Sequence, residues 1–253
     1  MLKEIIARIK QGKRTFKYPK GAPPVLSDKF KGRPIIDKSK CVVNCHVCSE
    51  VCPVGAVDDN MKIIDLGSCL FCNDCTDKCP TNAIFFTKDY RLTVRKRDDL
   101  LIHSEQKEMK LAKELSKNLK RIFGRSLKLR QVSAGGCGAC EADINVLGTI
   151  GWDLGRFGIQ FVASPRHADG IVVTGPVTKN MELALKKTYD AIPDPKIVIV
   201  VGACAISGGI YKGHPQVVSG VDSIIPVDLF IPGCPPNPLT ILDGLLRLQG
   251  KVK

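Results

Sequence analysis

Twelve cysteines are the residues of this sequence whose type and spacing could do chemistry. Eight of them fall in two runs, which read CVVNCHVCSEVCP and CLFCNDCTDKCP. The second run has the spacing C-x2-C-x2-C-x3-C-P, which is typical of chains that wrap a pair of [4Fe–4S] clusters. The first run keeps this pattern apart from one extra residue between its first two cysteines. The two runs therefore predict two [4Fe–4S] clusters.

The spacing assigns these eight cysteines to the clusters in a crossed pattern, because the fourth cysteine of such a run binds the other cluster of the pair. The first predicted set is Cys41, Cys45, Cys48 and Cys79, and the second is Cys52, Cys69, Cys72 and Cys75. A zinc ribbon is the alternative, but zinc sites use two C-x2-C pairs that a longer spacer separates. His46 lies between two of these cysteines, and we expect it to be an exposed loop residue and not a ligand.

The other four cysteines lie in glycine-rich turns of the second half. Cys137 and Cys140 lie in GGCGACEAD, Cys204 in GACAISGG and Cys234 in PGCPPNP. Each turn follows a short apolar stretch, and ligands of parallel sheets collect at the carboxyl ends of the strands. The glycines allow the backbone to approach a bulky ligand closely. We expect one site with four thiolates, which holds a third [4Fe–4S] cluster or, as the alternative, a zinc ion.

The elements that must position these cysteines follow from the apolar pattern. Strands are predicted at 127–133, 159–163, 170–174, 196–201 and 226–231, and helices at 141–150, 179–191 and 238–249. This alternation predicts an α/β, flavodoxin-like fold with a mainly parallel sheet. The cysteine runs before it predict a small α+β two-cluster ferredoxin domain, with a hairpin at 56–66 and a closing strand at 83–86.

We predict four segments in the chain. These are a basic arm and linker (1–36), the ferredoxin domain (37–97), a helical connector (98–126) and the domain of the third cluster (127–253). One helix with a narrow apolar face, which ends near Gly124, is expected in the connector.

The basic arm carries ten Lys and Arg residues but only two Asp and Glu residues. Leu2, Ile5, Ile6 and Ile9 follow helical spacing among the basic residues. Three uses compete, namely a helix on an anionic membrane surface, a strap along a partner subunit and nucleic-acid binding. The strap ranks first, and our prediction includes no nucleic-acid partner.

The sequence shows no export signal and no transmembrane segment of its own. The most apolar stretch, from Ile197 to Ile210, has about 14 residues, and a membrane-spanning helix needs roughly 20. Because no export signal is visible, we expect a cytoplasmic protein. In such a reducing compartment cysteines bind metal or do redox chemistry more often than they form disulfides.

The motifs of the second half also carry a family resemblance. The ordered set C-x-x-C-E, G-x-C-x-x-x-G-G and G-C-P-P resembles the small subunit of [NiFe]-hydrogenases and its relative in respiratory complex I, the subunit that holds that enzyme's terminal cluster. The stretch FGIQFVASPRHADGIVVTGPVT is similar to the matching segment of membrane-associated, energy-converting hydrogenases and formate hydrogenlyases. Cys137 and Cys140 have the hydrogenase spacing, whereas complex I subunits carry two adjacent cysteines there.

The resemblance implies roles for particular residues. Cys137, Cys140, Cys204 and Cys234 would hold the proximal cluster, beside a nickel–iron centre on a hydrogenase-type large subunit. Glu141 would lie in a proton path, or it would be an acid at a helix N-terminus that complements the helix dipole. Arg166 and His167 would hydrogen-bond near the cluster or the subunit interface, or they would shape a loop.

The predicted function is that of an electron-transfer subunit, without an active site of its own, in a multisubunit complex on the inner face of the cell membrane. Three [4Fe–4S] clusters would relay electrons between a soluble ferredoxin or donor dehydrogenase subunit and the hydrogenase-type large subunit. One alternative is a complex-I-like module without nickel, which passes electrons to a quinone, a sulfur compound or another acceptor. The other is a stand-alone ferredoxin-like or zinc-stabilised binding protein.

Overall fold

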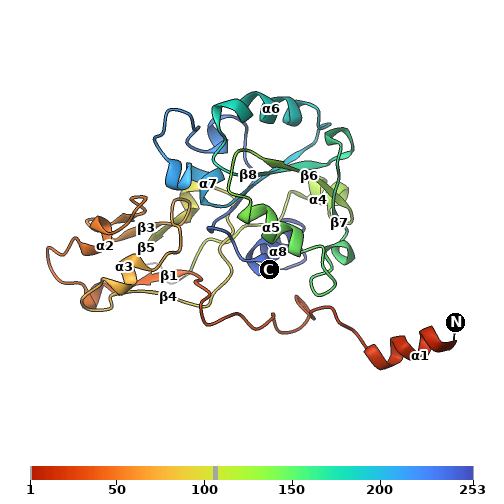
Figure 1. Cartoon of the computed structure of the whole chain (residues 1–253), viewed down its shortest axis with the longest axis horizontal. Helices are drawn as coiled ribbons and strands as arrows, with labels where there is room; N and C mark the ends of the chain where they lie inside the picture. Colours follow the sequence, from red (N-terminus) through yellow and green to blue (C-terminus); the bar gives the residue numbers. More distant parts are fainter. Residues whose placement is uncertain (1, 105–107, 253) are drawn as a thin grey trace.

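The larger lobe of the chain is built on a five-stranded parallel sheet (Figure 1). The computed structural model describes residues 2–104 and 108–252. The strands are β6 (Leu127–Ser133), β7 (Ile159–Phe161), β8 (Gly170–Thr174), β9 (Ile197–Val201) and β10 (Leu229–Ile231). Their order is β10-β9-β8-β6-β7, and all neighbours are parallel. This is the strand order of the flavodoxin-like fold, so the predicted fold class is confirmed.

Helices cover both faces of this sheet, and Figure 1 shows α6 on one side and α5 and α8 on the other. The helices are α5 (Ala139–Val146), α6 (Lys179–Asp190), α7 (Ala203–Ser207) and α8 (Pro238–Leu248). Successive residues of a strand point to opposite faces. Val173 of β8 therefore packs in one apolar cluster with Leu185 of α6, while Val172 packs in the other with Ile144 of α5. This double burial explains why β8 and β9 are apolar throughout.

The smaller lobe holds the two cysteine runs on short elements. Its strands are β1 (Pro34–Ile36), β2 (Val57–Asp58), β3 (Ile63–Asp65), β4 (Ile84–Phe86) and β5 (Leu101–His103), and its helices are α2 (Val47–Glu50) and α3 (Asp74–Asp77). The predicted hairpin is formed by β2 and β3. The predicted closing strand exists as β4, but it pairs with β1 of the supposed linker and not with the hairpin. The third strand beside the hairpin is β5.

The prediction of one helix in the connector was wrong in its extent. The α-helix there, α4, covers only Lys117–Phe123 and ends at Gly124. Earlier in the segment the chain forms a short 3-10 helix and then β5, which pairs with β3. Leu100 and Ile102 are buried while Leu101 between them is half-buried, which is the two-residue period of a strand. A sequence rich in leucine had suggested a helical period.

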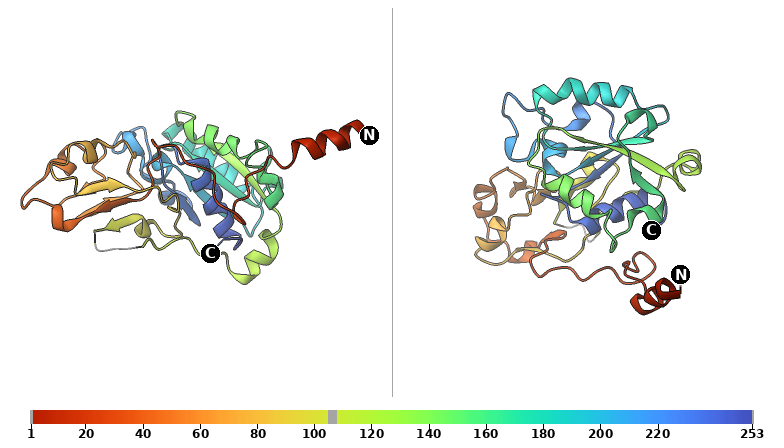
Figure 2. Two further views of the ribbon diagram at one scale, coloured as in Figure 1. Left: turned by 90° about the horizontal axis from the view of Figure 1, so that it is seen from below. Right: turned by 45° about the vertical axis from the view of Figure 1, so that its right-hand side comes forward.

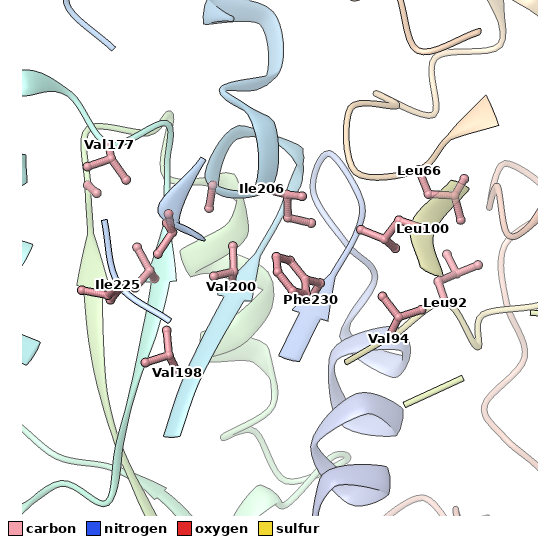
Figure 3. Close-up of a cluster of buried hydrophobic side chains, with 14 of the residues drawn as sticks. Leu66, Leu92, Val94, Leu100, Val177, Val198, Val200, Ile206, Ile225 and Phe230 are labelled. Carbon is pink, nitrogen blue, oxygen red and sulfur yellow. The ribbon is translucent and has the colours of Figure 1, made fainter. Parts of the chain in front are cut away.

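One apolar cluster crosses from the smaller lobe into the larger (Figure 3). Leu66, Leu92 and Leu100 lie on one side of it, and Ile206 and Phe230 lie on the other. The backbone joins there as well, because Val94 and Phe230 exchange two N–H···O=C bonds of 3.1 and 2.9 Å. Val94 thus adds one more pairing at the β10 edge of the sheet. The lobes share a core at this junction.

The basic arm folds onto the larger lobe after a projecting helix, α1 (Leu2–Gln11), which Figure 2 shows extending away from both lobes. Phe16 packs edge-on against Trp152 at 5.0 Å between ring centroids. Tyr18 is buried, and its hydroxyl donates to Asp243 of α8 at 2.7 Å. The segment predicted as an extended linker is therefore packed on this same chain. Among the described residues, none of the helices is both long and apolar enough to span a bilayer.

Candidate metal centres

The first predicted set of cysteines comes together around one small cavity. Cys41, Cys45, Cys48 and Cys79 all line it. The extra residue of the first run is absorbed in a turn, in which the N–H of Cys45 donates to the Val42 carbonyl at 3.3 Å. Asn44 makes this turn possible by adopting a φ of 58°, a left-handed conformation that asparagine tolerates better than most residues. The insertion thus leaves the four thiols grouped.

The second predicted set lines a neighbouring cavity of its own. Cys52, Cys69, Cys72 and Cys75 contribute to its wall. Burial raises the pKa of the Cys69 and Cys75 thiols to about 12, and the charges of neighbouring cysteines add to the rise. Such thiols are deprotonated only when a cation replaces the proton, as metal-site ligands are. The donor set therefore fits a metal centre.

The last cysteine of each run accepts the same kind of backbone hydrogen bond. The N–H of Ala56 donates to Cys52 Sγ at 3.2 Å, and the N–H of Ala83 donates to Cys79 Sγ at 3.2 Å. In both runs the donor lies four residues after the cysteine and beyond the proline. Hydrogen bonds to cluster sulfurs raise the reduction potential of iron–sulfur centres, so these two donors would tune their sites in parallel.

His46 pairs with an acidic side chain outside the cysteine runs. Its Nδ1 contacts Oδ2 of Asp59, and the hydrogen bond from His46 lowers the pKa of that carboxyl. His46 is exposed, as predicted, and the expectation that it is not a ligand stays a prediction. Sequence reasoning gave no sign that Asp59 would be its partner.

The third predicted set converges at the carboxyl edge of the larger sheet. Cys137 and Cys140 lie where α5 begins, Cys204 lies in α7, and Cys234 follows β10. Burial raises the pKa of Cys140 to about 12, and the charges of Glu141 and of the other three thiols add to the rise. The four thiols are thus close enough to influence one another.

Two glycines keep the space beside these thiols open. A Cβ on Gly202 would lie 2.5 Å from Cys140 Sγ, and one on Gly209 would lie 2.8 Å from Cys204 Sγ. Both glycines also have a positive φ, of 92° and 55°, where side chains are strained. Glycine is therefore required at both positions for two reasons, the backbone conformation and the space beside the thiol.

The three sets lie in a row, with the second in the middle. Cys48 of the first set contributes to the raised pKa of Cys75, and Cys72 of the second contributes to that of Cys234. A cavity of about 230 Å³ adjoins both the loop that carries Leu70 and Phe71 and the turn of Cys234. This arrangement brings one end of the smaller lobe next to the site on the larger sheet.

The remaining predicted site residues take different places. Glu141 lies in the first turn of α5 and accepts from the Thr174 hydroxyl at 2.6 Å. Burial raises its pKa, but hydrogen bonds from Ser133 and Thr174 outweigh burial and hold the pKa below its usual value. A role for Glu141 in a proton path stays a prediction. Arg166 and His167 are exposed and precede β8, so they lie toward the amino edge of the sheet, away from the cysteine turns.

An ion pair that sequence reasoning missed holds the loop of the second set. Both guanidinium Nη atoms of Arg97 donate to the carboxylate of Asp65, at 2.7 and 2.6 Å. The Asp65 carbonyl in turn accepts from the Cys69 N–H at 2.9 Å. Burial alone would raise the pKa of Asp65, but the bonds from Arg97 hold it below its ordinary value.

Replacing Arg97 by Gln is expected to lower the free energy of unfolding at pH 7 by about 1–3 kcal/mol, since Asp65 loses charge-assisted hydrogen bonds. A lowered folded-state pKa gives stability that is present above the unfolded value of 3.8 and is lost as pH falls below it. The difference between variant and native chain should therefore shrink below about pH 4. Urea unfolding followed by circular dichroism measures both effects.

Arg91 provides the matched control, because it forms a similar two-bond pair with Asp89 at a more exposed place. Replacing Arg91 by Gln should cost less than about 1 kcal/mol. Equal losses for the two variants would show that the Arg97 pair has no special part in holding the Cys69 loop.

No group of three or more His, Cys, Asp or Glu side chains in residues 2–104 and 108–252 is arranged to hold a single metal ion. A cubane takes one thiolate on each of four iron atoms, so this finding does not bear on the cluster prediction. Twelve thiols in three groups of four match the donors that three such cubanes require.

Comparison with known proteins identifies the family. The family model for the NADH ubiquinone oxidoreductase 20 Kd subunit matches residues 137–248, and the 4Fe-4S binding domain matches residues 62–85. An NADH-quinone oxidoreductase subunit of Bacteroides thetaiotaomicron is 43% identical over 167 residues, which cover 61% of this chain and 83% of that protein. The chain belongs to this oxidoreductase family. It is a subunit of an oxidoreductase complex, and it binds [4Fe–4S] clusters.

Two further proteins are similar to this chain. A probable membrane-bound hydrogenase subunit of Pyrococcus furiosus is 43% identical over 150 residues, which cover 59% of this chain and 88% of that protein. Among solved structures, a chain of the membrane-bound sulfane sulfur reductase, an archaeal respiratory membrane complex, is 34% identical. The match covers 54% of this chain and 75% of that one, with a TM-score of 0.47.

Proposed function

We propose that this chain is the electron-transfer subunit of a membrane-associated [NiFe]-hydrogenase-type complex, peripheral on the inner face of the cell membrane. The observation that carries the proposal is the row of three sets of four cysteines, which runs from the smaller lobe to the edge of the larger sheet. A soluble ferredoxin or a donor dehydrogenase subunit would meet one end of the row. A hydrogenase-type large subunit would meet the other.

Each set of four thiolates would hold one [4Fe–4S] cluster, which when bound supplies a site for one electron. The chain's own groups would set the properties of these sites. The N–H groups of Ala56 and Ala83 donate to Sγ atoms of the first two sets. Burial of Cys69, Cys75 and Cys140 removes water from the ligands. The apolar cluster that both lobes share would keep the second and third sets in a constant relation to each other.

Two features favour a hydrogenase over other complexes of the family. Cys137 and Cys140 are separated by two residues, as the resemblance to hydrogenase small subunits requires. The Pyrococcus furiosus relative, of which this chain covers 88%, is named as a probable membrane-bound hydrogenase subunit. The fusion with a 4Fe-4S binding domain in one chain extends the electron path toward a carrier.

A complex-I-like module without nickel is the second candidate. The Bacteroides thetaiotaomicron relative, named for an NADH-quinone oxidoreductase, favours it at the same identity of 43%. Such a module would pass electrons to a quinone, a sulfur compound or another acceptor. The partner subunit would decide between the two candidates, because a large subunit that binds nickel supports the first and its absence supports the second.

Isolation of the complex from its source through an affinity tag on this chain tests the proposal. We expect a large subunit with about one nickel per complex, hydrogen-dependent reduction of a dye, and about twelve iron and twelve sulfide per copy of this chain alone. A complex with the full iron content but no nickel and no hydrogen-dependent activity would favour the second candidate. About eight iron and one zinc per chain would contradict a third cluster.

A further inference from the structure

Helix α1 presents an apolar face that no part of the described chain covers. Leu2, Ile5, Ile6 and Ile9 are spaced by three or four residues, which places them on one side of a helix. Their exposed fractions lie between 44% and 74%. An exposed apolar face of this kind is unfavourable in water unless something covers it.

The residues around this face are strongly basic. Lys3, Arg8 and Lys10 lie on the helix, and Lys13 and Arg14 follow directly after it, whereas Glu4 is the one acidic residue between positions 2 and 14. All five basic side chains are exposed. An apolar stripe bordered by cations is the pattern of helices that lie in the headgroup region of anionic membranes.

The arm that follows α1 fixes where the helix can be. The N–H of Phe16 donates to the Gly151 carbonyl at 2.8 Å, and its ring packs on Trp152. Four residues lie between the helix and this anchor, so the end of α1 at Gln11 can lie at most about 18 Å from Phe16. Ile150, which precedes Gly151 in the chain, has an exposed fraction of 73%.

We infer that α1 lies on an anionic lipid surface, with Leu2, Ile5, Ile6 and Ile9 in the acyl boundary and the basic residues at the lipid headgroups. The helix is about 15 Å long, which is too short to span a bilayer but suits a position in the plane of the interface. The contacts of Phe16 and Tyr18 then transmit this attachment to the larger lobe.

A lipid surface fits these observations better than a partner protein does. The part of the arm after α1 contacts this chain's own lobes at Tyr18 and at residues 34–36. The part left uncovered is a single helix whose charges are nearly all of one sign. The inference does not depend on the proposed electron path, because lipid binding requires neither a partner subunit nor a reaction.

Sedimentation of the full-length, cluster-loaded chain with lipid vesicles tests the inference. We expect binding to vesicles of phosphatidylcholine with phosphatidylglycerol and little binding to phosphatidylcholine alone. The double variant Ile5→Ser/Ile9→Ser should bind the anionic vesicles about tenfold or more weakly, because two apolar side chains no longer enter the lipid. Replacing Lys3, Arg8 and Lys10 by Gln should weaken binding by about fivefold per cation at low salt.

The control variant Ile122→Ser/Leu183→Ser removes two apolar side chains that are also exposed, on α4 and α6. It should bind vesicles as the native chain does, and circular dichroism should show all variants folded. Equal binding by the native chain and the α1 variants would overturn the inference. The inference would also be overturned if the native chain does not bind vesicles and the α1 variants lose a partner subunit from the isolated complex.

Discussion

Replacing Cys234 by Ser is expected to remove one cluster and leave the other two. Iron should fall from about twelve to about eight atoms per chain, because a cubane that loses one of four thiolates is lost or weakly held. Under the proposed function, hydrogen-dependent electron transfer should also fall to background, since the lost cluster would be the one next to the proposed large subunit. Iron analysis and electron paramagnetic resonance of the reduced chain measure the cluster loss directly.

The same turn offers a control for this change. Asn237 begins α8, where its side chain accepts from the Leu239 N–H at 2.9 Å. Serine can make the same capping bond, so Asn237→Ser should keep the full iron content and activity. A Cys234→Ser chain that kept about twelve iron atoms would contradict the assignment of the third set. Loss of all three clusters together would mean that the lobes do not hold their sites independently.

Replacing Arg247 by Met is expected to cause the largest loss of stability among the changes considered. Asp243 has an exposed fraction of 0%, and it accepts from Arg247 Nε at 2.6 Å and from the Tyr18 hydroxyl. Without Arg247, a buried carboxylate would keep only the tyrosine. The free energy of unfolding should fall by about 3–5 kcal/mol, and Tyr18→Phe should cost about 1–2 kcal/mol. Thermal unfolding followed by circular dichroism tests both values.

The exposed pair of Glu182 and Lys186 on α6 is the matched comparison, since it has the same four-residue spacing and a distance of 2.8 Å. Lys186→Met should leave the free energy of unfolding nearly unchanged, because a solvated pair contributes little. A double variant, Asp243→Leu with Arg247→Met, should recover most of the stability lost in Arg247→Met alone. If the single and double variants are equally unstable, the buried pair is not the cause.

The features that depend on local pattern could be predicted from the sequence. The bounds of β6 and β8 were predicted correctly, because β8 is apolar and buried throughout, and the apolar residues of β6 are buried among polar residues that are exposed or half-buried. The grouping of the first eight cysteines followed from spacing within two short runs. The convergence of Cys204 and Cys234 with the first turn followed from the rule that parallel strands end at one edge.

The features that depend on distant contacts could not be predicted. Nothing in the local sequence of β4 shows that it pairs with β1, about fifty residues earlier, since pairing partners are chosen by the whole core. Tyr18 gave no sign of its contact with α8. The sequence did contain a signal for the ion pair that Tyr18 contacts, because Asp243 and Arg247 stand four residues apart in an otherwise apolar helix. Such a spacing in a buried helix predicts a paired charge.

The backbone pairing of Val94 with Phe230 has a consequence for the speed of electron flow. Redox groups on separate proteins must first meet by diffusion, at a rate that falls with dilution, whereas groups on one rigid scaffold react in a unimolecular step. Passage from the smaller lobe to the larger would therefore be independent of protein concentration. In the proposed complex, only the arrival of a carrier and the docking of a partner subunit would respond to dilution.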